Sequence, residues 1–279
     1  MKVMIRGAGD LASGIAYELW LAGHDILMTD IGVPLAVRRA VSFSRAVYEG
    51  KAQVENALGV LVHNREEALG VIASGNIAVI VDEKGQIRRE YRPDVLVDGI
   101  MAKRNTGTCI GDAPLVIGIG PGFCAGKDCH CVVETQRGPS LGKVIYQGSA
   151  APNTGIPGEV GGYTSERLLR AAGFGLMEPV AEIGDFIQAG ELAAVTGGVP
   201  VYAQISGVVR GMLQKGVQVK KGLKIGDVDA RKDRELCYTI SDKARCVGQG
   251  VLRAAVQAGA VKRYCCTVLQ PSCLRWANT

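Results

Sequence analysis

The first residues whose spacing suits a chemical task form a glycine-rich turn directly after an apolar run. Gly7, Gly9 and Ala12 stand in a G-x-G-x-x-A pattern after the run 2–6. In a βαβ unit the first glycine permits a tight turn and the second lets backbone N–H groups approach a phosphate. The small third residue lets helix and strand pack closely. The pattern therefore predicts a phosphate-binding turn at the start of the chain.

Two acidic residues accompany this turn. Asp30 ends a second apolar run, 21 residues after Gly9, where an acidic side chain binds a ribose hydroxyl in dinucleotide-binding proteins. Asp10 directly follows Gly9, and its carboxylate is placed to cap the free N–H groups of the next helix. We therefore predict that Gly7, Gly9, Asp10 and Asp30 lie at a nucleotide site, with Asp10 competing with a phosphate for the same donors.

A second candidate for phosphate binding is the glycine-rich segment 118–127. Repeated glycines expose backbone N–H groups, as an anion nest requires, and Lys127 adds a point charge. The segment is not a Walker loop, because Asp128 stands where a hydroxyl residue belongs. Simple turn formation is the alternative interpretation. The predicted ligand contacts in this segment are Gly120, Gly122, Gly126 and Lys127.

Charged residues follow two other apolar runs. Lys103 and Arg104 come after the run that ends at Asp98, where open α/β sheets place ligand-binding loops. We predict that both add positive charge to the site. Glu134 and Arg137 offer a carboxylate and an anion clamp, or pair with each other.

Three cysteines and a histidine lie close together at Cys124, Cys129, His130 and Cys131. Thiolate and imidazole are preferred zinc ligands, but this spacing fits no well-defined structural site. If 129–133 is a strand, Cys129 and Cys131 share one face and His130 points away. We predict no metal site, with Cys129 and Cys131 as the residues on which one would depend.

The sequence identifies no catalytic residue, and three candidates stand out. Cys124 near Lys127 has surroundings that lower a thiol pKa, and Lys127 and Lys103 are the other two. Packing as small buried hydrophobes is the alternative for the cysteines. Whether the protein catalyses a reaction is left open.

The elements that must position these residues alternate between strand and helix. Apolar runs at 59–62, 77–81, 94–98 and 114–118 predict buried strands, and 64–74 reads as a helix capped by Asn64. A further helix is expected over 34–41, with Pro34 in its first turn. This alternation predicts an α/β protein with a Rossmann-like parallel sheet.

The segment 178–230 carries an internal repeat. Residues 184–190 match 216–222 at an offset of 32, which is typical of a biotinyl/lipoyl-type β-sandwich. The lysine that carries the swinging arm in such modules is missing, since its place falls near Thr196 and Gly197. A closing helix follows, capped by Ser241 and ending at Gly259.

These observations divide the chain into three parts. Residues 1–174 are predicted to form the Rossmann-like domain with its glycine-rich loops, and 175–235 the β-sandwich without a carrier lysine. Residues 236–279 are predicted to form the C-terminal helix and a tail, loosely ordered from Cys265.

Composition narrows the partners. The chain of 279 residues has a net charge of +5 and only 5% aromatic residues, with its basic residues scattered as pairs. Stacking platforms for nucleic acid are therefore not expected, whereas a small anionic ligand is. No leader peptide or apolar run long enough to span a membrane is recognised. We expect a cytoplasmic protein whose nine cysteines are thiols; an oligomer remains open.

The chain resembles the YqeB-type accessory proteins of selenium-dependent molybdenum hydroxylases. The matching stretches span nearly the whole sequence, at 5–14, 34–39, 43–44, 46–48, 101–105, 118–123, 125–128, 134–138 and 240–244. The resemblance implies a cytosolic helper in maturing enzymes that carry labile selenium at a molybdenum cofactor. Cys124, Cys129 and Cys131 are not part of the family signature, which argues against a cysteine-based selenium relay.

Three functions follow as hypotheses. The first is a maturation factor that binds a dinucleotide or a molybdopterin-type cofactor and assists selenium or sulfur loading, with a molybdenum hydroxylase or other maturation proteins as partners and selenium bound transiently. The second is an NAD-dependent oxidoreductase, since Asp30 would repel the 2′-phosphate of NADP, although no Tyr-x-x-x-Lys pair is present. The third is a non-catalytic scaffold whose sandwich docks a partner enzyme.

Overall fold

The computed structural model describes residues 1–268, with side chains given for residues 1–259. Its main element is a nine-stranded sheet in which seven neighbouring strands run parallel and an antiparallel strand closes each edge. The strands are β1 (Lys2–Arg6), β2 (Asp25–Asp30), β3 (Lys51–Val54), β4 (Ala57–Val62), β5 (Ile77–Val81), β6 (Val95–Asp98), β7 (Leu115–Ile119), β8 (Cys131–Val133) and β9 (Val144–Ile145). Their order across the sheet is β3-β4-β5-β2-β1-β6-β7-β8-β9, which confirms the predicted α/β class.

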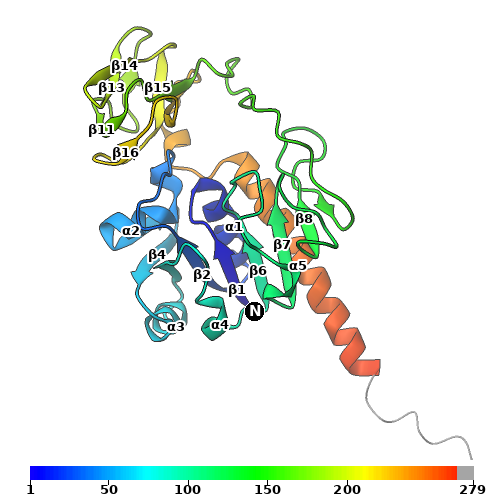
Figure 1. Ribbon diagram of the computed structural model, residues 1–279. Coiled ribbons are helices and arrows are strands. Elements are labelled where there is room, and N and C mark those ends of the chain that lie inside the picture. Colours follow the sequence, from blue (N-terminus) through cyan, green and yellow to red (C-terminus); the bar gives the residue numbers. More distant parts are fainter. Residues whose placement is uncertain (269–279) are drawn as a thin grey trace, which may run out of the picture.

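Helices cover both faces of this sheet (Figure 1). Val3 and Ile5 of β1 belong to the core under α1 (Asp10–Leu21) and α5 (Asp242–Val268). Met4 points to the other face, as strand alternation requires, and packs with α3 (Arg65–Ala73) and α4 (Arg88–Tyr91). The shorter elements are α2 (Ala46–Glu49) and the 3₁₀ turns η1 (Arg39–Val41), η2 (Phe43–Arg45), η3 (Ile110–Asp112) and η4 (Glu235–Cys237).

Two helix predictions are confirmed at their beginnings. Asn64 caps α3, since its side chain accepts a hydrogen bond from the Glu67 N–H, and Ser241 accepts one from the Ala244 N–H at 3.2 Å. The predicted end of the last helix is wrong, because α5 continues through Gly259 to Val268. The expected tail from Cys265 is thus helical as far as residue 268, and its remainder lies outside the described residues.

The predicted helix over 34–41 does not form. Its first residues form no regular structure, and only the 3₁₀ turn η1 follows. The backbone carbonyl of Val37 accepts a hydrogen bond from the Met212 N–H at 2.9 Å. Because this carbonyl pairs with a distant strand, the segment satisfies its backbone through tertiary contact and not through helical bonds.

A second module consists of two four-stranded antiparallel sheets. Their strands are β10 (Leu168–Arg170), β11 (Gly175–Pro179), β12 (Phe186–Ile187), β13 (Leu192–Thr196), β14 (Val199–Tyr202), β15 (Gly207–Met212), β16 (Gln218–Val219) and β17 (Lys224–Asp229). The sheet orders are β10-β17-β15-β12 and β14-β13-β11-β16. Since β10 pairs with β17, the sandwich begins before the predicted boundary at residue 175.

The predicted repeat of 32 residues extends over the whole sandwich. An offset of 32 carries β10 onto β14, β11 onto β15, β12 onto β16 and β13 onto β17. Each strand of one sheet is thereby matched to a strand of the other sheet, in the same order across the sheet. The module is therefore built from two equivalent halves, each of which contributes two strands to each sheet.

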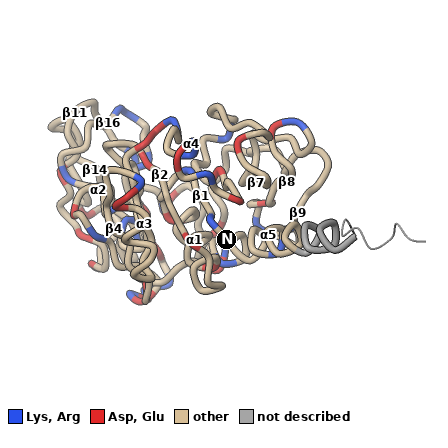
Figure 2. Tube along the Cα trace, turned by 90° about the horizontal axis from the view of Figure 1, so that it is seen from below, with Lys and Arg blue, Asp and Glu red and all other residues tan. Residues whose placement is uncertain are grey.

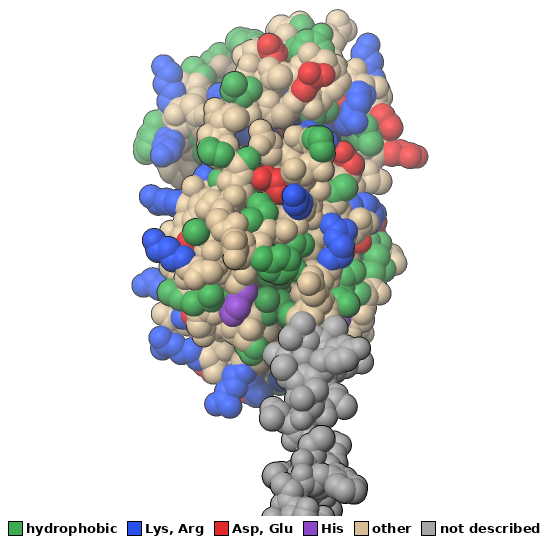
Figure 3. All heavy atoms as spheres, turned by 90° about the vertical axis from the view of Figure 1, so that its right-hand side faces the viewer, with side chains coloured by type: hydrophobic (Ala, Val, Ile, Leu, Met, Phe, Trp, Pro, Cys, Tyr) green, Lys and Arg blue, Asp and Glu red, His purple; other side chains and the backbone are tan. Residues whose placement is uncertain are grey.

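Basic and acidic residues are interspersed along the chain in Figure 2. On the face beside β8, shown in Figure 3, Lys and Arg side chains follow the left-hand edge, and apolar side chains form small groups between polar ones. Each of the six cysteines with described side chains is a free thiol. Through residue 268, no helix has both the length and the apolar character needed to cross a membrane.

Candidate functional site

A cleft of about 1530 Å³ opens between the sheet and the sandwich. One wall consists of the loops that follow β1, β2, β5, β6 and β8, at the carboxyl ends of the parallel strands. The other consists of residues from β15 and β17, and the first turn of α5 closes one side. Open α/β sheets bind their ligands at this edge, and the cleft exceeds the roughly 300–1,000 Å³ of ordinary ligand pockets.

The glycine turn lines the cleft. Gly7 has φ +93°, and a Cβ at this position would stand 3.1 Å from the backbone of Ile100. Only glycine combines this left-handed backbone with so close an approach. Gly9 precedes the first residue of α1 and has open space where a Cβ would stand. The turn therefore keeps its backbone accessible from the cleft.

Asp30 also lines the cleft, but its carboxylate supports the turn. One oxygen accepts the Ala8 N–H at 3.2 Å and the other accepts the Ile31 N–H at 2.8 Å. Burial raises the pKa of Asp30 and these two N–H groups lower it, with burial the larger effect. Asp30 thus holds the glycine turn in place and remains half-buried at the cleft wall.

The prediction that Asp10 caps its own helix is wrong. No side chain caps the first turn of α1. The Asp10 carboxylate instead turns toward Arg38, at 3.8 Å. Arg38 is held by the carbonyls of Leu236 and Thr239, each at 3.0 Å. The expected competition between the Asp10 carboxylate and a phosphate for the N–H groups of α1 is therefore absent.

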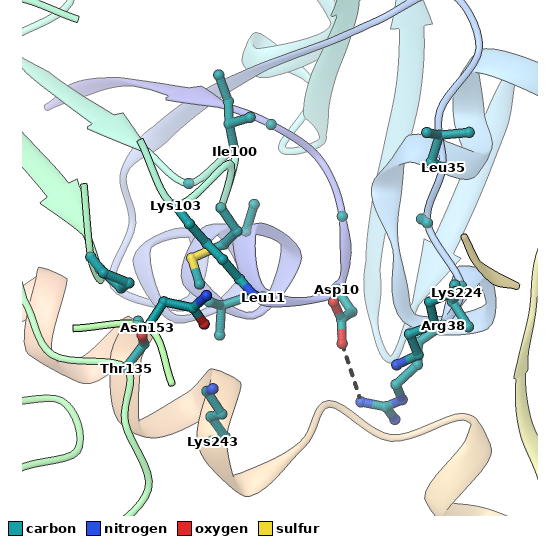
Figure 4. Close-up of a pocket in the computed structure, with 18 of the residues that line it drawn as sticks. Asp10, Leu11, Leu35, Arg38, Ile100, Lys103, Thr135, Asn153, Lys224 and Lys243 are labelled. Atoms are coloured by element: carbon teal, nitrogen blue, oxygen red, sulfur yellow. Dashed lines mark ion pairs between the residues drawn. The ribbon is translucent and has the colours of Figure 1, made fainter. Parts of the chain in front are cut away.

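Three lysines converge on this turn from separate parts of the chain: Lys103 from the loop after β6, Lys224 from β17 and Lys243 from the first turn of α5. Figure 4 shows Lys103 extending to the first turn of α1, and Lys224 beside Arg38 on the other side of Asp10. Within the described chain, none of the three ammonium groups makes a hydrogen bond or an ion pair. Burial lowers the pKa of Lys224 and Lys243. The Asp227 and then the Asp10 carboxylate oppose this effect at Lys224, and Asp10 opposes it at Lys243.

The beginnings of α1 and α5 lie side by side. A Cβ on Gly14 would stand 2.6 Å from the Ala244 Cβ, and one on Gly248 would stand 3.0 Å from the Gly14 carbonyl oxygen. The two helices therefore run parallel, and the first turns of α1 pack against the first turns of α5. The residues at both N-termini line the cleft. Helix N-termini attract anions through their free N–H groups and dipoles.

Glu134 and Arg137 line the cleft without pairing with each other. Glu134 accepts the N–H groups of Thr135, Gln136 and Ala151, each at 2.7 Å, and so shapes the wall after β8. Arg137 binds Asp242 of α5 with both terminal nitrogens, at 2.7 and 2.9 Å. This hydrogen-bonded pair lowers the pKa of Asp242 to about 2.

The predicted anion nest at 118–127 does not form part of the cleft, where only Pro121 of that segment appears. The backbone N–H groups of residues 124–128 are directed inward, to the carbonyls of Gly148, Cys129 and Cys124 and to the Asp128 carboxylate. Five of the predicted contacts lie outside the cleft wall, as does the catalytic candidate Cys124. These contacts are Arg104, Gly120, Gly122, Gly126 and Lys127.

The same loop instead supports residues that do reach the cleft. A Cβ on Gly122 would stand 2.6 Å from the Arg104 nitrogen, next to Lys103. One on Gly120 would stand 2.6 Å from Thr135 Oγ1. These glycines let the loop pack directly behind Lys103 and Thr135, both of which line the cleft.

The cysteine cluster is structural. The strand β8 begins only at Cys131, so the condition under which Cys129 and Cys131 would share one face is not met, and the two thiols are buried in different apolar clusters. Burial raises the pKa of Cys129 to about 11 and that of Cys131 to about 12. His130 Nδ1 accepts the Val116 N–H at 2.9 Å. No group of three or more potential metal ligands forms among the residues with described side chains.

Comparison with known proteins confirms the resemblance to YqeB itself. No protein-family model matches the chain. Over 252 residues the chain is 43% identical to the uncharacterised protein YqeB of Escherichia coli K12. The aligned region covers 90% of this chain and 47% of YqeB. The chain thus spans about half the length of this relative.

Solved structures show only a low likeness. An aspartoacylase family protein from Mesorhizobium loti is 11% identical, covering 73% of this chain and 84% of its own, with a TM-score of 0.27. A succinylglutamate desuccinylase/aspartoacylase from Rhodobacter sphaeroides is 14% identical, covering 82% and 88%, with a TM-score of 0.25. Scores at this level carry no argument about fold or function.

Proposed function

We propose that this homologue of YqeB binds a phosphate-bearing, nucleotide-like ligand in its cleft. The observation that carries the proposal is the convergence of two helix N-termini with Lys103, Lys224 and Lys243. The helix dipoles and free N–H groups favour an anion, and lysine supplies compact point charges suited to phosphate. The lysines gain partners when such a ligand binds, and the glycine turn lets it approach the backbone.

The biological role that we propose is maturation of selenium-dependent molybdenum hydroxylases in the cytoplasm. The support is the family resemblance together with a cleft large enough for a pterin bearing a phosphate or nucleotide. We interpret the sheet as Rossmann-like and the second module as biotinyl/lipoyl-like. In this role the protein holds the molybdenum cofactor while selenium or sulfur is loaded, with the hydroxylase or another maturation protein as its partner.

An NAD-dependent oxidoreductase is the second candidate, and the observation that favours it is Asp30. This half-buried carboxylate stands at the end of β2, beside the glycine turn. Both of its oxygens already accept backbone N–H groups, so a ribose hydroxyl would share the carboxylate with the turn. This candidate requires a change in nicotinamide absorbance with some substrate.

Native mass spectrometry distinguishes the two candidates. The purified protein is mixed separately with NAD, NADP, nucleoside triphosphates, molybdenum cofactor and selenide. We expect a complex with the molybdenum cofactor. Binding of nicotinamide nucleotides alone would contradict the maturation role and favour the oxidoreductase. In cells, deletion should leave the hydroxylase expressed but inactive.

A further inference from the structure

We propose that the β-sandwich supplies a direct ligand contact, with Lys224 binding an anionic phosphate group of the ligand. This inference rests on the proposed function and deepens it, because it makes the module that resembles a carrier domain the source of a specific ligand contact. The module then acts as a fixed wall of the site and not as an arm that delivers a tethered group.

Lys224 stands on the face of β17 that is turned toward the cleft. Ile225 and Val228 of the same strand pack in the core of the sandwich, whereas Lys224 and Asp227 line the cleft. Lys224 is half-buried. Its charge therefore lies where a ligand held at the glycine turn would meet the sandwich.

Asp227, a carboxylate on the same strand whose charge acts on Lys224, already has partners. One oxygen of Asp227 pairs with Arg167 and the other with Arg210, whose Nε lies at 2.8 Å. Asp227 is thus shared between two arginines and makes no ion pair with Lys224 within the described chain, although its charge favours the protonated form of Lys224. Burial disfavours the charged ammonium group of Lys224, and the Asp227 and Asp10 carboxylates offset this effect only in part. An anionic ligand in the cleft would therefore stabilise it further.

The repeat shows that the sandwich itself does not require this charge. Shifting by 32 residues places Leu192 at the position equivalent to Lys224 and Val195 at that of Asp227, in the sheet that does not line the cleft. The same architecture is therefore built once with apolar residues at these positions and once with charged ones. The charged version occurs on the side where the ligand is proposed to bind.

The carrier alternative lacks its reactive group. The β13–β14 hairpin turns at Gly197 and Gly198, both with positive φ. The hydroxyl of Thr196 before this turn is buried and accepts the N–H groups of Ala172 and Gly173 at 3.0 and 3.1 Å. This hairpin is therefore a structural corner with no amine to modify.

The test uses isothermal titration of the full chain with pyrophosphate, ADP and NAD at fixed ionic strength. Lys224→Gln is compared with Lys220→Gln, an exposed lysine of the same module that gives the same change in net charge, and with Lys243→Gln. We expect Lys224→Gln to weaken pyrophosphate and ADP binding about tenfold to a hundredfold, as the loss of a charge-assisted hydrogen bond implies. Lys220→Gln should stay within about twofold of the unmodified protein.

Each other outcome has a distinct meaning. If Lys243→Gln weakens binding but Lys224→Gln matches Lys220→Gln, the inference is wrong and the proposed function stands. If the unmodified protein binds none of the three probes, the inference about Lys224 fails, and the proposed function then fails only if the molybdenum cofactor also gives no complex in native mass spectrometry. If Lys224→Gln unfolds at a lower temperature than the unmodified protein, Lys224→Leu takes its place, because the equivalent position in the other half of the repeat is Leu192. Lys224→Arg keeps the charge and should retain binding.

Discussion

Gly14 of α1 lies directly against Ala244 of α5, so close that a Cβ on Gly14 would stand 2.6 Å from that of Ala244. This contact sets the two helices in register and brings their N-termini to the same end of the cleft. Glu18 and Arg245 continue the seam with an ion pair at 3.0 Å. The geometry of the proposed anion site therefore depends on a glycine that contacts no ligand.

Replacing this glycine should destabilise the protein. We expect Gly14→Ala to lower the free energy of unfolding by about 1–3 kcal/mol, because the added methyl group forces the helices apart. Gly70→Ala in α3 is the matched control, since a Cβ there meets nothing within 4 Å, and it should be neutral or stabilise by up to about 1 kcal/mol. Urea unfolding measures both. If the two substitutions changed the free energy of unfolding equally, the contact between α1 and α5 would tolerate a wider spacing of the helices.

Lys243 should be a major source of anion affinity. Lys243→Gln removes a positive charge at the first turn of α5 and should weaken ADP binding about tenfold or more. Lys51→Gln on the exposed edge strand β3 removes the same charge far from the cleft. Titration calorimetry at two salt concentrations checks the result. The interpretation fails if both variants bind equally well.

Asp10 should oppose anion binding. Its carboxylate lies near Arg38 and influences Lys224 and Lys243, so Asp10→Asn makes the centre of the cleft more positive. We expect pyrophosphate to bind about threefold to tenfold more tightly, within the range of one partly screened charge. Repeating the titration with Mg²⁺ separates a second role, because weaker binding that appears only with Mg²⁺ would make Asp10 a metal ligand.

The Arg137–Asp242 pair should contribute to stability at neutral pH. The pKa of Asp242 falls from 3.8 to about 2 in the folded protein. Its contribution is therefore present above about pH 4 and is lost as the pH falls toward 2. Because Asp242 is 70% exposed, we expect at most about 1 kcal/mol. Urea midpoints between pH 5 and pH 2 should decline less for Asp242→Asn than for the unmodified protein or for Glu66→Gln.

Cysteine reactivity should follow burial. Cys109 and Cys246 are exposed thiols and should alkylate with iodoacetamide at about pH 8, near the ordinary thiol pKa. Cys129 and Cys131, with pKa values raised to about 11 and 12, should react only after unfolding. Peptide mass spectrometry with and without urea reads each site. Rapid alkylation of Cys131 in the folded protein would contradict its placement in the core.

Local pattern sufficed for the sheet and the glycine turn. Gly7, Gly9 and Asp30 could be placed from sequence because the chemistry of a βαβ start is set by neighbours along one short segment. Lys103 was found for a related reason, since its loop follows a strand that the apolar run of β6 predicts. In each case the position of the residue depends on the strand that it ends or follows, and that strand can be recognised from the local sequence.

Lys224 and Lys243 could not be placed in this way. Each reaches the cleft only because the sandwich and α5 return to the first domain, and no spacing in the sequence encodes that return. The Ser241-Asp242-Lys243 stretch was a signal for Lys243, since it belongs to the family pattern and follows a helix cap. The sequence signal for Lys224 was weaker. It is a charged residue at a position where the other half of the repeat has the apolar Leu192.

The glycine-rich loop shows the opposite limit. Glycines and a lysine describe an anion nest and a tight supporting turn equally well. The difference depends on acceptors such as the Gly148 carbonyl, which lies outside the pattern. The segment 34–41 is similar, because its helical tendency is overridden by a backbone bond to Met212.

The pairing of α1 with α5 also governs when the protein can fold during synthesis. Val3, Ile5 and Ile15 pack in one core with Val247 and Val251, which the ribosome adds more than two hundred residues later. Until that segment emerges, one apolar face of the first strands is uncovered and exposed to aggregation. The first domain is thus among the last parts to be completed, and a chain that stalls after the sandwich would need a chaperone to protect that face.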